Sequence, residues 1–332
     1  MTFSSVAKYT ASMFLAGSLL AACSGGLQET RLTPTSNQSA YGRSWMASDS
    51  GKQNLLYFSD LNSTVYVYSY PGRKLEGTLS DSAGPAGLCV DKSGDVFVTN
   101  RNGGDILEYA HGGTQPIATI NDAGYVPVDC SVDLSTGDLA VANFCEISGD
   151  ECIGPGNVDI YKNASGTPVS ITDTAIPFFY DCSYDSRGNL FVGGNATKFQ
   201  SGFQLAELKT GRTTFDNISL NRVVFWPGGV LWDGKYVVVG DGDAGGNGTS
   251  SIHRVAVKGT QGTIVSTTHL AKAGEIAHFW IQGSTLIAPD NPSRKSANVL
   301  FYSYPKEREP TAVITGSFGI ATLDGATVSL AR

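Results

Sequence analysis

The sequence predicts an all-β protein, a β-propeller of four-stranded antiparallel blades, from a repeated phrase, its spacing and the composition. The phrase occurs as Gly-Leu-Cys-Val-Asp (87–91), Val-Asp-Cys-Ser-Val-Asp (128–133) and Tyr-Asp-Cys-Ser-Tyr-Asp (180–185). Its copies stand about forty to fifty residues apart, which is the length of one propeller blade. Gly contributes 40 residues and charged residues only 16%, a composition that favours tight turns between strands. The repeat therefore predicts a ring of blades.

Each repeat unit resolves into four apolar segments separated by turns. In the unit that begins at Gly87, these segments are residues 87–91, 95–99, 105–110 and 116–120. They alternate apolar and polar residues with the period of a strand, and no helical period is present. The sequence Tyr-Ser-Tyr-Pro occurs at 68–71 and again at 302–305, which indicates internal duplication.

Six units can be laid out along the chain, and seven blades are the alternative. The units begin near Ser44, Gly87, Val128, Tyr180, Gly228 and Ala277. A blade cannot bury both faces of its sheet alone, so the ring must close. The tail segments 318–323 and 326–330 are similar to the opening of a unit, and we expect them to return to the first blade as its closing strand.

The N-terminal segment has the features of a signal peptide. Lys8 supplies a positive charge, and residues 13–20 form an apolar stretch too short to span a bilayer. The tetrad Leu-Ala-Ala-Cys (20–23) resembles the lipobox of bacterial lipoproteins, which implies that Cys23 is acylated and anchors the chain in a membrane. The alternative is an ordinary signal peptide with a chance Cys.

This resemblance divides the chain into three parts and implies a location. The parts are a signal peptide at 1–22, the lipidated Cys and a flexible tether at 23–42, and the propeller at 43–332. Ser24 is similar to the residue that directs bacterial lipoproteins to the outer membrane. We therefore expect a protein anchored in the bacterial cell envelope, on its periplasmic or surface face.

The other cysteines are expected to differ in state. Cys145 and Cys152 bracket a short polar insertion and are the best disulfide candidates. Cys89, Cys130 and Cys182 occur once in each repeat phrase, on different blades. Packed sheets lie about 10 Å apart, whereas a disulfide needs Cα atoms within roughly 7 Å. These three are therefore predicted to be buried free thiols, with a three-thiolate metal site as the alternative.

Charge and missing motifs exclude several classes of function. The net charge of −7 offers no attraction to nucleic acid or to an anionic membrane surface. The sequence contains no nucleophile elbow, phosphate-binding loop, zinc-ligand spacing or dinucleotide fingerprint.

The repeat resembles that of a known group of propellers. Pro-Ala-Gly-Leu-Cys-Val-Asp (85–91), followed by Gly-Asp-Val-Phe-Val (94–98), is similar to the repeat of the NHL and SMP-30/gluconolactonase propellers, which are TolB-like and six-bladed. Pro-Gly-Gly-Val-Leu-Trp-Asp (227–233) is a weaker match. The group includes lactonases, lyases, receptors and interaction platforms, so the resemblance implies a fold and leaves the activity open.

The resemblance implies a ligand site at the mouth where the innermost strands begin and the second strands end. Polar residues and one Trp fall there, at Asp60, Asn100, Asp129, Asn143, Asp181, Asn195, Asp241, Asp290 and Trp280. Oxygen ligands of this kind suit Ca²⁺. In the lactonases a Glu, an Asn and an Asp hold a divalent ion at the mouth, and the matching candidates are Asn143, Asn195 and Asp241. The alternative is that these residues cap turns at strand ends.

Two further residues near the mouth are candidates for catalysis. His278 is a candidate general base, with a packed His as the alternative, and Glu275 lies close to it in the sequence. The lactonases carry a metal-binding Glu on their first innermost strand, but residues 44–47, assigned to that strand, contain none. The repeated Asp91, Asp133 and Asp185, with Asp233, lie at the opposite hairpins, where a structural role is expected.

These observations favour binding over catalysis. We expect a membrane-anchored module that binds a protein or a glycan, with Tyr180, Phe279 and Trp280 as contact residues. The alternative is a Ca²⁺-dependent lactonase-like hydrolase or lyase, and the third possibility is a structural envelope component.

Overall fold

The computed structural model describes residues 43–332 except for 81, 150, 198–201, 243–249, 292–296, 307–308, 317 and 319–321. The predicted signal peptide, the lipidation site Cys23 and the tether lie outside these residues. In the part of the chain that is described, no helix is long and apolar enough to cross a membrane.

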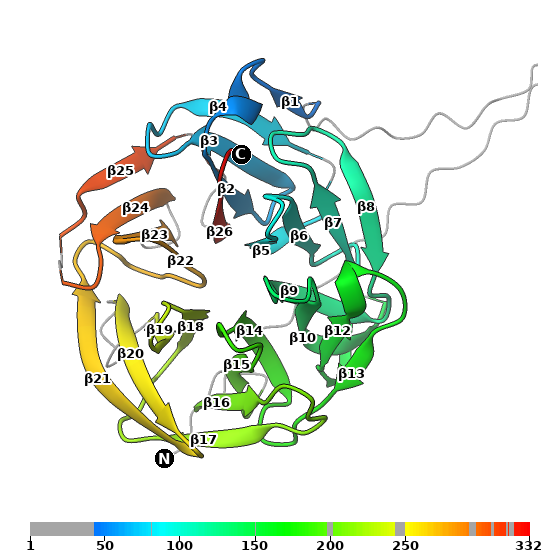
Figure 1. Ribbon diagram of the computed structural model, residues 1–332, viewed down its shortest axis with the longest axis vertical. Helices are drawn as coiled ribbons and strands as arrows, with labels where there is room; N and C mark the ends of the chain where they lie inside the picture. The colour runs from blue at the N-terminus through cyan, green and yellow to red at the C-terminus, as the bar shows by residue number, and fades with distance from the viewer. Residues whose placement is uncertain are drawn as a thin grey trace, which may run out of the picture. The chain divides into compact units, whose positions relative to one another are not determined.

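The described residues form six blades around a central axis, as the repeat predicts (Figure 1). Each blade is built on four strands, and blades 1 and 3 carry a fifth. Blade 1 contains β1 (Trp45–Met46), β2 (Leu55–Asp60), β3 (Thr64–Ser69), β4 (Leu75–Leu79) and β26 (Leu323–Ser329). Blade 2 contains β5 (Pro85–Val90), β6 (Val96–Asn100), β7 (Asp105–Tyr109) and β8 (Pro116–Asn121). Blade 3 contains β9 (Tyr125–Val132), β10 (Leu139–Ser148), β11 (Glu151–Pro155), β12 (Val158–Tyr161) and β13 (Val169–Ile171).

The other three blades repeat the same meander. Blade 4 contains β14 (Phe178–Tyr184), β15 (Leu190–Asn195), β16 (Phe203–Leu208) and β17 (Asp216–Leu220). Blade 5 contains β18 (Pro227–Trp232), β19 (Val237–Asp241), β20 (Ser250–Lys258) and β21 (Gln261–Leu270). Blade 6 contains β22 (Trp280–Gln282), β23 (Thr285–Asp290), β24 (Asn298–Ser303) and β25 (Ala312–Thr315). Short 3-10 turns occur at η1 (Ser50–Lys52) and η2 (Lys162–Ala164).

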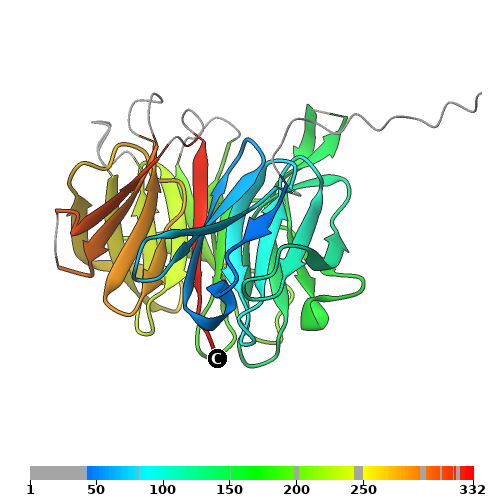
Figure 2. The same ribbon diagram turned by 90° about the horizontal axis from the view of Figure 1, so that it is seen from above.

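The C-terminal strand closes the ring, as predicted. β26 pairs antiparallel with β2 and becomes the innermost strand of blade 1 (Figures 1 and 2). The expectation that residues 44–47 form this innermost strand was wrong. Because β26 occupies the axial side of β2, the N-terminal strand β1 pairs with the free outer edge of β4.

Apolar side chains fill the spaces between neighbouring blades. Because side chains alternate along a strand, each innermost strand packs against the blade on either side. Leu88 of β5 belongs to the cluster shared with blade 1, and the next residue, Cys89, to the cluster shared with blade 3. Ring closure thus buries both faces of every sheet.

Two disulfides form in the described residues. Cys145 and Cys152, the pair favoured by their spacing, are bonded across the β10–β11 hairpin. The prediction of free thiols at Cys89 and Cys130 was wrong, because these two residues of neighbouring innermost strands are bonded to each other, with Cα atoms 5.6 Å apart. Cys182 is free and buried, as expected.

A register difference of one residue explains the unexpected bond. Cys89 stands two residues before Asp91, whereas Cys130 stands three residues before Asp133. Successive side chains of a strand point to opposite faces of its sheet, so a difference of one position turns the two Cys side chains in opposite directions. Cys89 of blade 2 and Cys130 of blade 3 therefore both point into the space between these two blades. The innermost strands also converge toward the axis. The backbones of neighbouring innermost strands are therefore closer together than the middle strands of neighbouring blades.

The Asp residues at the inner hairpins are structural, as the sequence suggested. Asp91, Asp133, Asp185 and Asp233 each accept at least one backbone N–H from their own turn. Such Asx turns satisfy the donors of the tight connection between the first and second strands.

A candidate metal site in the central cavity

A cavity of about 1100 Å³ runs along the axis, and the innermost strands of all six blades contribute to its wall. One end holds Asp129, Asp181 and His278. The other end is formed by the inner hairpins and by Leu330 and Arg332, on the face where the C-terminus lies (Figure 2). The cavity therefore extends from three residues that the sequence placed near the mouth toward the hairpins at the ends of the innermost strands.

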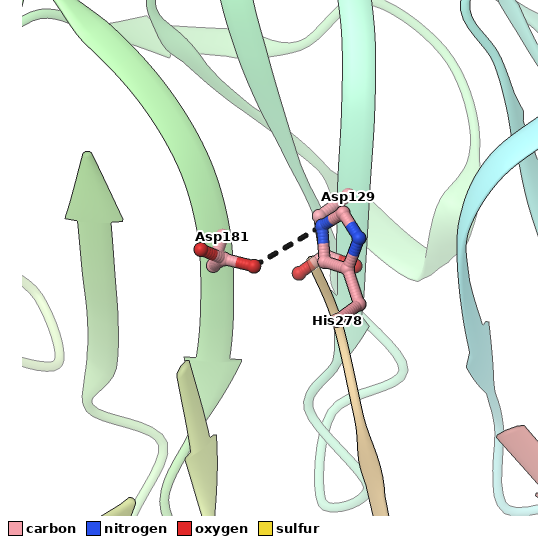
Figure 3. Close-up of side chains that lie close together, drawn as sticks. All are labelled: Asp129, Asp181 and His278. Atoms are coloured by element: carbon pink, nitrogen blue, oxygen red, sulfur yellow. Dashed lines mark ion pairs between the residues drawn. The ribbon is translucent and has the colours of Figure 1, made fainter. Parts of the chain in front are cut away.

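Three side chains from three blades meet at the end of the cavity that holds Asp129, Asp181 and His278, called here its inner end. Asp129 comes from the middle of β9, Asp181 from the middle of β14, and His278 from the segment just before β22 (Figure 3). One nitrogen or oxygen atom from each lies within 4.8 Å of the other two. His278 Nε2 is 3.1 Å from Asp181 Oδ1.

A fourth side chain holds His278 from the other side. Asp324 of the closing strand β26 places its Oδ1 3.2 Å from His278 Nδ1. The imidazole therefore lies between two carboxylates, one on each ring nitrogen. Asp324 was not among the predicted site residues, because the first innermost strand was assigned to residues 44–47.

The backbone makes room for these groups and orients them. Asp129 Oδ2 accepts a hydrogen bond from the Cys182 amide on the next blade, at 3.0 Å. A Cβ added to Gly87 would lie 2.4 Å from Asp129 Oδ1, so only Gly fits beside this carboxylate. Gly229 has a φ of +100°, and a Cβ there would lie 2.7 Å from the Phe279 ring.

The cluster is buried and carries more acid than base. Burial, opposed by His278 and reinforced by Asp181, raises the pKa of Asp129 to about 7. Burial also raises the pKa of Asp181, although His278 partly offsets it. Burial lowers the pKa of His278, but Asp324 and Asp181 together outweigh burial and raise it well above its ordinary value. Three carboxylates thus surround one imidazole, an excess of negative charge that a bound cation would neutralise.

The wall beyond the cluster is mainly apolar and aromatic. Tyr184, Trp232 and Trp280 line it together with the aliphatic residues Leu88, Val132, Leu231 and Val328. The outer end carries Lys92 and Arg332 and two exposed leucines, Leu134 and Leu330. The cavity thus combines an acidic inner end with an amphipathic wall.

Most of the other residues predicted at the mouth hold backbone connections. Asn100 Oδ1 accepts from the Ala83 amide, Asp241 from Phe225 and Trp226, and Asp290 from Gly274 and Glu275. Asp60 accepts from Asn62 and Thr322, next to the closing strand. Each of these side chains therefore connects the end of a second strand to a nearby loop by hydrogen bonds, as expected for residues that cap turns.

The candidate metal set Asn143, Asn195 and Asp241 does not line the cavity. Asn143 donates to Asn157 and Asp159 of its own blade. The Asn195 side chain is fully buried, and neither its Oδ1 nor its Nδ2 has a hydrogen-bond partner among the described residues. Glu275 does not line the cavity either, and Tyr180 packs on Phe144 with ring centroids 5.1 Å apart.

The donor set at the inner end of the cavity fits a divalent metal ion. Both Asp181 oxygens are buried, and the nearest cationic group is the His278 imidazole, 3.1 Å from Oδ1, so a cation could bind between these two side chains. His278 can hold its Nδ1 proton on Asp324 and present Nε2 toward Asp129 and Asp181. A carboxylate that orients a ligating imidazole in this way is common around protein-bound metals.

Solved structures share this fold at low sequence identity. A chain of the crystal structure of a nidogen/laminin complex aligns with a TM-score of 0.65 and 13% identity, covering 84% of this chain and 99% of that one. A protein of unknown function from Bacteroides caccae aligns with a TM-score of 0.60 and 11% identity, covering 83% of this chain and 99% of that one. The sequence matches no protein-family model and no curated protein. At these identities the likeness shows the β-propeller fold alone.

Proposed function

We propose that this protein binds a small glycan in its central cavity, through a divalent cation held by Asp129, Asp181 and His278. The observation that best supports this function is the convergence of the three side chains at the inner end of the cavity. Ligand sites of proteins are typically concave, mostly apolar and equipped with a few convergent polar groups.

The ligand set suggests which cation is held. Imidazole suits Zn²⁺ and similar transition ions, and carboxylates also suit Mn²⁺. The all-oxygen ring expected from the sequence suited Ca²⁺ instead. With His278 in the set, we expect Zn²⁺ or Mn²⁺ to bind more tightly than Ca²⁺. Three protein ligands leave coordination positions for a bound molecule.

The cavity wall favours a sugar as that molecule. Tyr184, Trp232 and Trp280 line the space beyond the acidic cluster. Aromatic side chains offer apolar faces for the C–H side of a sugar ring and polar tips for its hydroxyls. Sugar hydroxyl oxygens would complete the coordination of the cation.

Metal binding is the first test of this proposal. Equilibrium dialysis of the purified chain against Zn²⁺ or Mn²⁺ should give one tightly bound ion. Asp181→Asn and His278→Gln should each weaken binding by about 10- to 100-fold. Asp216→Asn is the matched control, because Asp216 lies on the surface in an ion pair with Lys209. Equal metal affinity in all four proteins would contradict the proposal.

Glycan binding is tested on the metal-loaded protein. A glycan array should show binding that is lost after treatment with a chelator and in Trp280→Ala. Binding that survives both changes would place the glycan elsewhere, and the absence of any glycan ligand would overturn this function while leaving the metal site standing.

The location in the cell envelope is part of the proposal. The Leu-Ala-Ala-Cys tetrad at 20–23 supports a lipid anchor on Cys23 that presents the propeller through the following tether. Incorporation of labelled palmitate should be lost in Cys23→Ser. Equal labelling of the two proteins would exclude the anchor.

A metal-dependent hydrolase is the second candidate, consistent with the repeat's similarity to the SMP-30/gluconolactonase group. Asp324 favours it, because the true innermost strand of blade 1 carries an acidic residue beside the cluster. A bound cation would polarise a lactone or ester carbonyl. Turnover of a lactone panel by the metal-loaded chain, lost in Asp181→Asn, would support hydrolysis. A metal-loaded protein inert on the panel would exclude lactone hydrolysis.

A further inference from the structure

A second group of buried oxygen atoms lies in blade 3, apart from the central cavity. Its members are Asp122, Asn143, Asn157 and Asp159, called here the blade 3 oxygen cluster. Their exposed fractions are 4%, 0%, 1% and 2%, respectively. Asp122 belongs to the connection from blade 2, whereas the other three lie on or beside β10 and β12. None of them lines the central cavity.

The hydrogen bonds of this cluster converge on one amide group. Asn143 Nδ2 donates to Asn157 Oδ1 at 2.8 Å and to Asp159 Oδ2 at 3.2 Å. Asn157 Nδ2 donates to Asp159 Oδ1 at 3.1 Å, and the Tyr161 hydroxyl donates to Asp122 Oδ1 at 2.6 Å. Asp122 also interacts with Asp159, and burial together with this neighbouring carboxylate raises the pKa of Asp122 to about 7, although Tyr161 and Asn143 oppose the shift. The Asn143 amide is thus the donor that lies between the Asn157 and Asp159 oxygens.

Two buried oxygens of the cluster have no hydrogen bond. Asp122 Oδ2 and Asn143 Oδ1 are shielded from solvent and have no partner among the described residues. Nor does any described Lys, Arg or His form an ion pair with Asp122 or Asp159. Two adjacent carboxylates without a counter-ion and an orphaned amide oxygen are costly in a protein interior.

We propose that the blade 3 oxygen cluster is a Ca²⁺ site. A half-turn of the Asn143 amide about its last side-chain bond would bring Oδ1 to the place of Nδ2, facing Asn157 Oδ1 and Asp159 Oδ2. Without a cation these oxygens would repel one another; with Ca²⁺ between them they become ligands. Two carboxylates and two amide oxygens can supply most of the six to eight oxygen ligands that Ca²⁺ accepts, and water can supply the rest.

This site would have a structural role, because it joins two blades. Asp122 precedes β9, and its amide donates to the Gly104 carbonyl of blade 2. Asp159 lies on β12, where the exposed Ser170 of β13 also donates to it. A Ca²⁺ ion held by both Asp residues would fasten the blade 2–3 connection to the strands of blade 3.

Thermal unfolding of the chelator-treated chain tests the proposal. Added Ca²⁺ should raise the Tm of the wild-type chain and of Asp181→Asn by several degrees. Asp159→Asn should lose this shift. The proposal is overturned if Ca²⁺ leaves the wild-type Tm unchanged, or if the shift is kept in Asp159→Asn and lost in Asp181→Asn. The second pattern would assign Ca²⁺ to the central cavity.

A second variant keeps the test decisive if Asp159→Asn does not fold. Asn143→Asp adds a third carboxylate of nearly the same shape. At a cation site it should lower the Tm without Ca²⁺ and tighten Ca²⁺ binding on the order of tenfold, measured by titration calorimetry. A hydrogen-bond network that binds no cation would show the lower Tm with no gain in Ca²⁺ affinity, and that result would refute the site.

Discussion

At the scale of single residues, the central site depends on glycines as much as on charged groups. Asp129 can approach the axis because the neighbouring strand has no side chain at Gly87. The atoms that a Cβ at Gly87 would meet include the Asp129 Cα and the Val128 carbonyl, at 2.6 and 2.7 Å. These are backbone atoms, which cannot move aside as the end of a flexible side chain can.

Gly87→Ala should therefore damage both the fold and the site. Overpacking against a backbone costs about 1–3 kcal/mol, so the urea midpoint should fall by the corresponding amount. Affinity for Zn²⁺ should also fall, because Asp129 must turn away from the inserted methyl group. Gly51→Ala is the control, since a Cβ there meets no atom within 4 Å. Unchanged unfolding and metal affinity in Gly87→Ala would show that the strands can separate freely.

The site was predictable to the extent that its residues follow the repeat. Asp129 and Asp181 stand directly before a Cys of the repeated phrase, and His278 opens the last unit. Asp324 could not be found this way, because the tail Leu-Asp-Gly-Ala (323–326) contains neither that Cys nor the hairpin Asp. Its role arises from ring closure, which is a long-range pairing that local sequence does not encode.

At the scale of elements, a partly buried ion pair of blade 5 is connected to blade 6 through the Tyr304 hydroxyl. Asp233, at the end of β18, accepts from Arg254 Nε at 2.6 Å and from the Tyr304 hydroxyl at 2.7 Å. Arg254 in turn lies over the Tyr304 ring, 4.9 Å from its centroid. Burial raises the pKa of Asp233, but these hydrogen bonds and those from the Lys235 and Tyr236 amides outweigh burial and lower it from 3.8.

Asp233→Asn should destabilise the ring and flatten its acid response. A lowered pKa means that the unfolded chain binds the proton first, so this carboxylate stabilises the fold above its ordinary pKa and loses the effect as pH falls through the lowered value. At neutral pH, the free energy of unfolding of the variant should be roughly 2–3 kcal/mol lower than that of the wild type. When the pH falls from about 5 to about 3, the variant should lose less of its remaining stability than the wild type loses. Urea unfolding at several pH values measures both effects. Asp216→Asn should change neither, and parallel pH curves for wild type and Asp233→Asn would contradict the assignment.

The two disulfides should contribute unequally, because they close loops of different length. Cys89 and Cys130 are 41 residues apart, whereas Cys145 and Cys152 are 7 apart. The loop-entropy relation predicts that removing the first bond costs about 1.5 kcal/mol more than removing the second. Urea unfolding of the two double Cys→Ala variants measures this difference. An equal loss in both would mean that the unfolded chain is already constrained near β5 and β9.

At the scale of the whole molecule, the number of blades was more predictable than their edges. Repeated turns and strand periods mark every blade, so six units could be counted along the chain. The order of strands at the two chain ends was harder, because the segments that form β1 and β26 could each occupy either edge of blade 1. Burial decides between them: every residue of β26 is buried, whereas Trp45 of β1 is 45% exposed.

Loss of the closing strand should therefore open the whole ring. A chain that ends at Thr322 lacks β26, which leaves the axial edge of β2 unpaired and removes Asp324 from His278. We expect this chain to lose its cooperative thermal transition and its metal binding, and to recover both when a peptide of residues 323–332 is added. A chain that begins at residue 43 is the matched control, because it keeps every described strand and should unfold like the full-length protein. If the chain ending at Thr322 unfolded cooperatively at the wild-type temperature, blade 1 would be stable without its innermost strand, and closure through β26 would not hold the propeller together.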